Sequence, residues 1–385
     1  MVRGAVRAIA ANARQRVRVR VFCCPLLAGD DTRGRWLSGG ADRPLAQNFF
    51  FEAIASDMNS MRIAVVIPYF QREPGILVRA LRSIEAQQAV EDVVIVIVDD
   101  ASPVPASDEL ARWQGQRRFP VEVIEQPNGG PASGRNRGLD ALGDEIRYIA
   151  FLDSDDEWTP MHLAHAVQGL CAGNDFYFSD FYQLDQTVSA FKRAGRIDID
   201  KHPKIGESGF LHRYVGDMFN QILTGNLIGT PAVVLDRAAL EDIRFNDALV
   251  NAGEDYLFWM ACARRNARFC FSTEIEVHCG GGVNVYSGSV WGTESYLIRV
   301  HHEMKYRKLL LKDKNLNLEQ RHFVNGRIKA LRGEFARGLL HRVMHRESID
   351  LAILKAQAML DPLSMIEVPL VVGSHAASRI KQTRR

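Results

Sequence analysis

Short, nearly continuous apolar runs alternate with helical patterns between residue 61 and about residue 160. The runs resemble strands buried on both faces of a sheet, and they cover residues 63–67, 93–98, 121–124 and 148–152. The segments between them carry apolar residues at helical spacing, at 76, 77, 80, 81 and 84 and again over about 132–142. Strands that alternate with helices in this way predict an α/β domain with a largely parallel sheet.

The pattern changes beyond residue 160. Residues 185–225 are polar and irregular, and we expect them to form loops over a site. A further strand is predicted at 228–235 and a helix at 255–264. Residues 294–360 carry helical patterns, with lysine and arginine gathered around 305–314.

These changes predict the domain organisation. The expected parts are an N-terminal extension (1–60), an α/β domain (61–290, with halves 61–160 and 161–290) and a helical C-terminal region (291–385). The first twenty residues contain six arginines and no acid, and no long apolar signal-peptide core follows them. Met58 and Met61 stand directly before the first strand. We therefore expect residues 1–57 to be disordered or to lie upstream of the true start of translation.

Composition narrows the possible functions. The chain has 48 lysines and arginines against 46 acidic residues, whereas nucleic-acid-binding proteins usually present a strongly basic face. A nucleic-acid partner is therefore not expected. No run approaches the roughly 18 apolar residues that a membrane-spanning helix needs.

An acidic cluster, Asp153-Ser154-Asp155-Asp156, directly follows the run at 148–152. In parallel α/β sheets, ligands bind beyond the carboxyl ends of the strands. Carboxylates this close together repel one another unless a cation joins them, and a few hard oxygen ligands suit Mg²⁺ or Mn²⁺ completed by a diphosphate and water. The alternative is a solvated turn that caps a helix starting near Thr159; the buried run before the cluster favours the metal.

Two further polar segments follow predicted strands. Asp99-Asp100 ends the run at 93–98, where a carboxylate can accept a hydrogen bond from a base N–H or a ribose hydroxyl. The glycine-containing loop 128–131 leads into Arg135, and its backbone N–H groups can approach an anion at a helix start. A tight turn explains each segment alone about as well, but their convergence on one sheet edge predicts a binding site.

Three candidates lie further along the chain. Glu254 and Asp255 open the predicted helix at 255–264. One of them could be a general base for an acceptor hydroxyl, although the helix dipole by itself also favours an acid at this position. His278 could complete the shell of the metal, with a purely structural histidine as the alternative.

Taken together, these residues resemble the inverting family-2 glycosyltransferases. The matching segments are 66–70, 98–102, 128–131 with 135–139, 151–158 and Glu254-Asp255. The resemblance covers about residues 61–290. It implies a GT-A fold, with a Rossmann-like and mostly parallel nucleotide-binding sheet, to which the helical C-terminal extension is added.

The resemblance also implies roles for single residues. The residues expected to bind the nucleotide sugar are Pro68, Tyr69, Asp100, Asn128, Arg135 and Asp153. The first three would hold the uracil of a UDP-sugar, the next two would line the nucleotide pocket, and the last would lie near the ribose or sugar. Asp155 and Asp156 would bind Mn²⁺ or Mg²⁺. Asp255 would be the catalytic base, with Glu254 as its neighbour and second candidate.

A narrower similarity concerns residues 67–77, which look like those of the glucosyltransferases of succinoglycan-type bacterial exopolysaccharide assembly. It implies transfer of a single glucose with inversion to a saccharide acceptor carried on a polyprenyl diphosphate. The enzyme would be cytoplasmic, with peripheral contact at the inner membrane face through its basic helices and tail. Gly134 departs from the alanine usual in the family. The QxxRW motif of polymerising members is absent after Asp255, which favours single addition.

Two other functions are compatible with parts of the sequence. A sugar-phosphate nucleotidyltransferase can share the sheet, but it should carry a glycine-rich basic loop after the first strand, and residues 69–73 contain no glycine. A carbohydrate-binding subunit with a degenerate site would be expected to lose its acids, and those at 153, 155, 156, 254 and 255 are intact.

Overall fold

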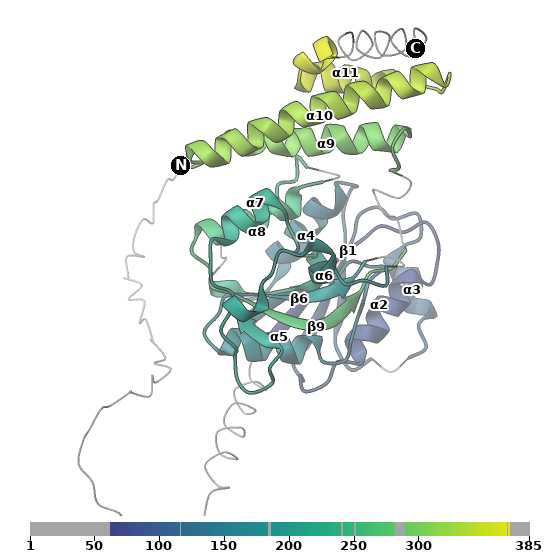
Figure 1. Cartoon of the computed structure of the whole chain (residues 1–385). Coiled ribbons are helices and arrows are strands. Elements are labelled where there is room, and N and C mark those ends of the chain that lie inside the picture. Colours follow the sequence, from purple (N-terminus) through teal and green to yellow (C-terminus); the bar gives the residue numbers. More distant parts are fainter. Residues whose placement is uncertain are drawn as a thin grey trace, which may run out of the picture. The chain divides into compact units, whose positions relative to one another are not determined.

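The computed structural model describes residues 62–367 and 369, except 116, 184–185, 240–241, 250–251 and 282–288. The extension predicted over residues 1–60 and the basic tail from residue 371 therefore lie outside the described residues. The described elements are an α/β sheet domain and a group of C-terminal helices (Figure 1).

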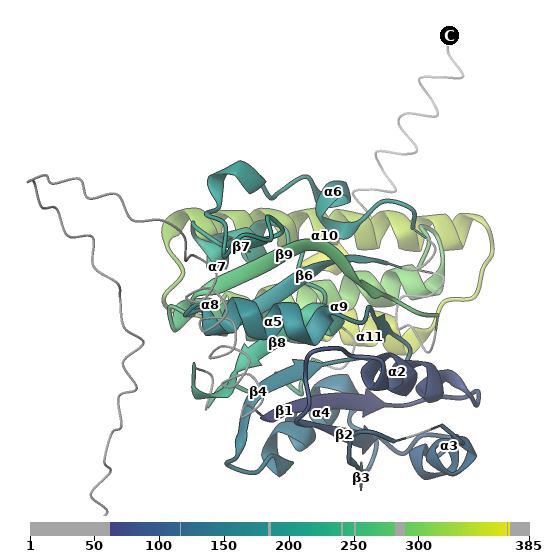
Figure 2. The same ribbon diagram turned by 90° about the horizontal axis from the view of Figure 1, so that it is seen from below.

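The first half of the sheet consists of the four strands expected from the sequence. These are β1 (Arg62–Tyr69), β2 (Val93–Asp99), β3 (Val121–Glu125) and β4 (Ile146–Phe151). They lie in the order β3-β2-β1-β4, and each adjacent pair is parallel (Figure 2). Their carboxyl ends therefore share one edge, which confirms the predicted parallel sheet.

Helices cover both faces of these strands. They are α2 (Ile76–Glu85), α3 (Ala106–Arg112) and α4 (Gly130–Ala141). Because strand side chains alternate between faces, Val65 of β1 belongs to the same core cluster as Leu77 of α2, and Val66 to that of Leu139 of α4. Gly138 lets α4 approach the sheet closely, since a Cβ there would lie 2.5 Å from Cγ1 of Val66.

The second half of the sheet is mixed in direction. Its strands are β5 (Glu157–Trp158), β6 (Phe176–Tyr182), β7 (Leu211–Arg213), β8 (Val233–Asp236) and β9 (Phe269–His278). β8 is antiparallel to β4 and to β6, while β6 and β9 are parallel. β5 and β7 pair with β9 in antiparallel fashion and complete a nine-stranded sheet. The helices of this half are α5 (His162–Cys171), α6 (Ala190–Ala194), α7 (Met218–Thr224) and α8 (Glu254–Arg264).

The sequence predictions for this half are partly wrong. The strand expected at 228–235 begins only at Val233, because residues Thr230–Ala232 form a 3₁₀ turn in which Ala232 N–H donates to Gly229 O at 3.1 Å. Pro231 favours this turn, since it has no N–H to give to a strand pair. The region 185–225, expected to be irregular, contains α6, β7, α7 and a 3₁₀ turn (Ile199–Lys201). The helix expected at 255–264 is confirmed as α8.

Three helices follow the sheet domain, as expected for residues 294–360. They are α9 (Glu294–Leu310), α10 (Leu318–Met344) and α11 (Leu351–Leu360), and Figure 1 shows them side by side. Asn317 and Gln320 form a capping box that starts α10. Tyr306 and Leu310 of α9 belong to the same core cluster as residues of α7 and α8. Among the described helices, none combines the length and the apolar character needed to cross a bilayer.

Candidate active site

A cleft of about 670 Å³ lies at the carboxyl ends of the parallel strands. Its lining contains these predicted site residues: Pro68, Tyr69, Asp100, Asn128, Arg135, Asp153, Asp155, Asp156, Glu254 and Asp255. Residues from α6 and from the segment 226–231 complete the wall. Residues far apart in the sequence, from strand ends and from the start of α8, therefore share one cavity.

Asp100 fixes the loop that leads into α4. Its buried carboxylate accepts hydrogen bonds from the backbone N–H groups of Gly129 and Gly130, each at 2.7 Å, and from Gln126 Nε2 at 2.7 Å. Asn128 Nδ2 in turn donates to Asp100 O at 2.9 Å. Three of the roughly four lone-pair positions of the carboxylate are thus used within the protein. Asp100 shapes the loop in addition to lining the cleft.

Arg135 connects the two halves of the site. This α4 side chain is only 3% exposed. Its Nη2 lies 2.6 Å from Asp153 Oδ1, its Nη1 lies 3.3 Å from Glu254 Oε1, and its guanidinium lies over the ring of Phe245 at 5.3 Å. The sequence predicted a nucleotide-pocket residue. In the structure Arg135 also compensates the charges of two carboxylates, one that follows β4 and one that starts α8.

The acidic cluster is held against the end of β9. Gly280 N–H donates to Asp156 Oδ1 at 2.8 Å, and a Cβ at Gly280 would lie 1.7 Å from the carbonyl oxygen of Asp155, so no other residue fits there without a backbone shift. Asp156 is 5% exposed, whereas Asp153 is open to the cleft. Burial, and then the charges of Asp153 and Asp155, raise the pKa of Asp156 well above its ordinary value.

Glu254 and Asp255 stand at the first turn of α8, after Gly253 in the left-handed conformation (φ 83°). Glu254 is engaged by Arg135, and burial raises its pKa. Burial, and then the charge of Glu254, raise the pKa of Asp255 to about 8. Asp255 Oδ1 accepts from the N–H of Tyr256 at 2.8 Å. Asp255 is therefore the better placed of the two acids to take up a proton.

Comparison with known proteins agrees with this geometry. The sequence profile described as "Glycosyl transferase family 2" matches residues 64–240. The chain is 35% identical over 229 residues to the succinoglycan biosynthesis protein ExoW of Rhizobium meliloti (strain 1021), a match that covers 58% of this chain and 70% of that protein. The chain belongs to glycosyl transferase family 2.

One further relative of this glycosyltransferase and one solved structure extend the comparison. The chain is 26% identical to the amylovoran biosynthesis glycosyltransferase AmsB of Erwinia amylovora, over 52% of this chain and 63% of that protein. The structure of the mannosyltransferase PcManGT from Pyrobaculum calidifontis, in complex with GDP-Man and Mn²⁺, matches with a TM-score of 0.50 at 16% identity, covering 83% of this chain and 88% of that one. This last likeness concerns the fold, and it agrees with the GT-A architecture expected from the sequence.

The acidic cluster of the glycosyltransferase fits a divalent cation. Three carboxylates lie close enough for Asp153 and Asp155 to raise the pKa of Asp156, and a cation would relieve that repulsion. Within the described residues, no group of three or more His, Cys, Asp and Glu side chains is arranged to hold an ion unaided. Mg²⁺-type sites commonly use only one or two carboxylates, together with substrate phosphates and water. Asp155 and Asp156 suit such a site.

His278 differs from the other predicted residues. It ends β9, is exposed, and its ring faces that of Tyr182 with the centroids 5.7 Å apart. Its neighbours Cys279 and Gly280 line the cleft, but His278 is not part of the lining. Its role as a metal ligand remains a prediction, and this placement does not favour it.

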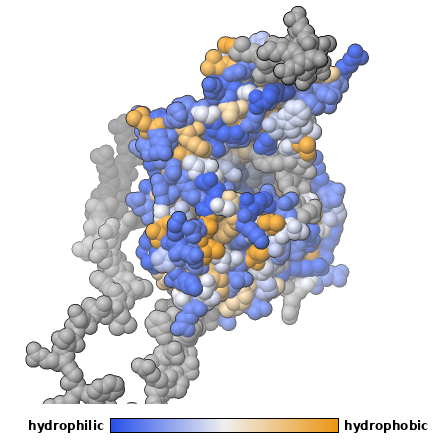
Figure 3. All heavy atoms as spheres, in the orientation of Figure 1, coloured by the Kyte–Doolittle hydropathy of each residue, from blue (hydrophilic) through white to orange (hydrophobic). Residues whose placement is uncertain are grey.

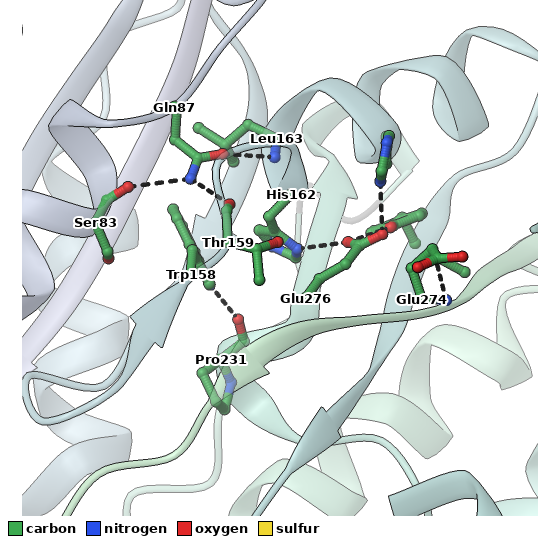
Figure 4. Close-up of polar contacts among 12 residues, drawn as sticks. Ser83, Gln87, Trp158, Thr159, His162, Leu163, Pro231, Glu274 and Glu276 are labelled. Atoms are coloured by element: carbon green, nitrogen blue, oxygen red, sulfur yellow. Dashed lines mark hydrogen bonds and ion pairs between the residues drawn. The ribbon is translucent and has the colours of Figure 1, made fainter. Parts of the chain in front are cut away.

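A buried polar network lies on β9, next to the site (Figure 4). Glu276 of β9 accepts hydrogen bonds from His162 Nδ1 at 2.9 Å, His165 Nδ1 at 2.8 Å and the hydroxyl of Tyr177 at 2.6 Å. Burial acts to raise the pKa of Glu276, but these hydrogen bonds lower it to about 2. The network ties α5 and β6 to β9, the strand that reaches the acidic cluster.

Trp158 connects this network to the cleft wall. It follows Asp156 by two residues, and its ring lies 4.6 Å from that of His162, centroid to centroid. Its indole N–H donates to Pro231 O at 2.6 Å, and Figure 4 shows the ring directed at this residue. The backbone N–H of Thr159 donates to Glu276 O at 2.9 Å. The segment after the acidic cluster is therefore anchored on two sides.

Several lining residues were not among those predicted from the sequence: Gln71, Gln183, Arg193, Asn226 and Tyr256. Gln71 is buried and donates from Nε2 to Ser154 Oγ at 2.9 Å. Gln71 follows the end of β1 by two residues, so its place after a predicted strand could have marked it as a site residue. Arg193 lies in the polar region 185–225 and Asn226 directly follows it; this region was expected to form loops over a site, but no motif singles out either residue.

Proposed function

We propose that this glycosyltransferase transfers a single sugar, glucose, from a UDP-sugar to a saccharide acceptor with inversion at the anomeric carbon. The observation that supports it is the convergence of Asp100, Asp153, Asp155, Asp156 and Asp255 on one cleft. Had these positions lain on separate surfaces, no donor site could be built from them.

The parallel strands would hold the nucleotide. The uracil would lie against Pro68 and Tyr69, where the remaining acceptor position of Asp100 could take a base N–H. Asn128 would contact the nucleotide from the loop before α4. Asp155 and Asp156 would bind Mn²⁺ or Mg²⁺, which supplies positive charge to the departing diphosphate.

Asp255 would act as the base. Its carboxylate takes the proton of the acceptor hydroxyl while the acceptor oxygen forms a bond to the anomeric carbon, and the bond from that carbon to the UDP oxygen breaks. The electron pair leaves with UDP. Arg135 would act as a positioning residue, since it contacts Asp153 beside the metal cluster and Glu254 beside the proposed base. Burial and Glu254 keep the pKa of Asp255 high enough for effective proton uptake.

We further propose that the acceptor is a polyprenyl-diphosphate oligosaccharide of bacterial exopolysaccharide assembly, at the cytoplasmic face of the membrane. The names of ExoW and AmsB, both polysaccharide biosynthesis proteins, support this setting. The C-terminal region exposes Leu351, Met359 and Ile366. Figure 3 shows a mostly hydrophilic face with small apolar groups, one of them near α11. Such residues could contact lipid.

The test is a donor panel with purified full-length protein and Mn²⁺. We expect UDP release from UDP-glucose to exceed that from UDP-galactose and UDP-N-acetylglucosamine, and to depend on a lipid-diphosphate saccharide. NMR of the product should show a β-linked glucose from the α-linked donor. Turnover of GDP-mannose alone would contradict the donor assignment. Formation of pyrophosphate from UTP and glucose 1-phosphate would instead indicate a nucleotidyltransferase.

A further inference from the structure

The described lining of the cleft is strongly unbalanced in charge. Six carboxyl groups line it: Asp100, Asp153, Asp155, Asp156, Glu254 and Asp255. The guanidinium groups of Arg135 and Arg193 are the basic groups in the same lining. An anionic diphosphate has to enter this cleft, so each positive charge that remains available matters for its binding.

The two arginines differ in what they already contact. Arg135 is paired with Asp153 and Glu254, and its charge is compensated. Arg193 donates from Nη2 to the neutral amide oxygen of Gln183 at 2.8 Å. Among the residues that the structure describes, no carboxylate forms an ion pair with Arg193. Its planar fork of donors suits a phosphate.

The helix that carries Arg193 is short but well anchored. Asp180 of β6 is buried, and its Oδ1 accepts from the N–H of Phe191 at 2.9 Å. The ring of Phe191 packs against Phe178 and Phe271, with centroids 5.8 and 6.0 Å away. Gly195 ends α6 in the left-handed conformation and donates to Phe191 O. Figure 2 shows α6 lying beside β6 and β9. The core therefore fixes the backbone of α6 at Arg193, while the exposed Arg193 side chain is held by Gln183.

Arg193 and the acidic cluster line the same cleft, and a chain of contacts connects them. Its partner Gln183 directly follows β6, whose last carbonyl, that of Tyr182, accepts from Cys279 N–H at 2.9 Å. The next residue, Gly280, contacts both Asp155 and Asp156. Arg193 is thus connected through Gln183 to the end of the cleft that would hold the metal and the phosphates.

We propose that Arg193 binds the diphosphate of the nucleotide-sugar donor, an inference that rests on the function proposed above. In this arrangement Arg193 contacts the phosphate oxygens from α6, and the cation proposed at Asp155 and Asp156 binds the same diphosphate. The inference adds a donor-binding residue from the half of the site that carries the acceptor machinery.

The experiment compares Arg193→Gln with Lys192→Gln, its matched control. Lys192 is the preceding residue on α6, is exposed and does not line the cleft, so the control removes the same charge from the same helix. Binding of UDP and of uridine is measured by calorimetry or competition with Mn²⁺ present. A charged hydrogen bond at an open site predicts about tenfold weaker UDP binding for Arg193→Gln. Uridine binding should stay within about twofold of wild type, and Lys192→Gln should change neither.

Arg193→Lys supplies a further check, since it should restore part of the UDP affinity by returning the charge. The inference is wrong if Arg193→Gln binds UDP as wild type does, or loses uridine and UDP equally. It is also wrong if only the KM for the lipid-diphosphate acceptor rises. Failure of the wild-type protein to bind UDP would count against the proposed function instead, so the two failures are distinguishable.

Discussion

The cleft has a proposed nucleotide half, from residues 61–160, and a proposed acceptor half, from residues 161–290, and the two are built by different means. In the nucleotide half, Tyr69, Asp100 and Asp153 each stand at or just beyond the carboxyl end of a parallel strand, within consecutive strand–helix units. In the acceptor half, the pairing of Phe176 on β6 with Phe269 on β9 joins segments far apart in the sequence. Local chain order thus places the residues of the nucleotide half, whereas long-range packing places Glu254 and Asp255 against them.

The C-terminal helices contribute to the acceptor half. A Cβ at Gly253 would lie 2.5 Å from Cγ of Tyr306 on α9, directly before the acids that open α8. Tyr306 also packs edge-on against Tyr256, with ring centroids 5.8 Å apart. Arg307 Nη1 donates to Leu223 O at 3.0 Å. Helix α9 therefore packs against the residues on either side of the proposed base. The helix lies outside the region matched by the family profile.

The largest expected effects are those of Asp155→Asn and Asp255→Asn, which should affect UDP binding and turnover differently. Asp155→Asn should abolish turnover and weaken UDP binding in the presence of Mn²⁺, because it removes a proposed cation ligand. Asp255→Asn should leave UDP affinity nearly intact and lower kcat by about 10²–10⁴-fold, the usual contribution of a general base. Calorimetry with UDP and Mn²⁺, combined with initial rates, measures both.

Asp200→Asn, at an exposed aspartate that does not line the cleft, is the matched control and should behave as wild type. Equal loss of UDP binding in Asp155→Asn and Asp255→Asn would contradict the proposal that one half binds the nucleotide and the other supplies the base.

The next effect concerns the connection between the halves. Arg135→Met should destabilise the fold by about 3 kcal/mol, because it leaves Glu254 and Asp153 without their compensating charge. Urea unfolding measures the free energy. The double variant Arg135→Met/Glu254→Gln should regain part of the loss, since it removes the more buried of the two uncompensated charges. A double variant no more stable than the single one would show that this ion pair does not join the halves.

The sequence predicted the nucleotide half of the site better than the acceptor half. The nearly continuous apolar runs and the motif positions after β1, β2 and β4 predicted the nucleotide half, down to Asp100 and Asp153. The strands β6 and β9 were not predicted, and the first part of the strand expected at 228–235 is a 3₁₀ turn that contains Pro231. The link from Arg135 to Glu254 spans 119 residues. Neither this pair nor Arg193 could be found by periodicity, because only the folded sheet brings them to the cleft.

A smaller effect should appear in the pH dependence of the acceptor half. Asp255 must be ionised to accept a proton, and with a pKa of about 8 it is mostly protonated at lower pH. We therefore expect kcat/KM to rise with pH, up to about tenfold per unit, and to level off above pH 8. Glu254 and Arg135 are the charged groups that act on Asp255. Glu254→Gln should shift the profile toward lower pH, because it removes the repelling charge. A profile that is flat between pH 6 and 8 would speak against Asp255 as the base.

The smallest effect tests the contact between the segment after the acidic cluster and the cleft wall. Trp158→Phe keeps most of the ring that packs on His162 but removes the hydrogen bond to Pro231 O. A lost buried hydrogen bond predicts a free energy of unfolding lower by about 1 kcal/mol. Trp291→Phe, at a half-exposed tryptophan outside the cleft lining, is the control and should change the free energy of unfolding by less than about 0.5 kcal/mol.

If Trp158 also holds the segment 226–231 in place, Trp158→Phe should raise the KM for the acceptor and leave UDP affinity unchanged. A drop in UDP affinity instead would mean that the contact serves the nucleotide half, where Asp155 and Asp156 precede it in the chain.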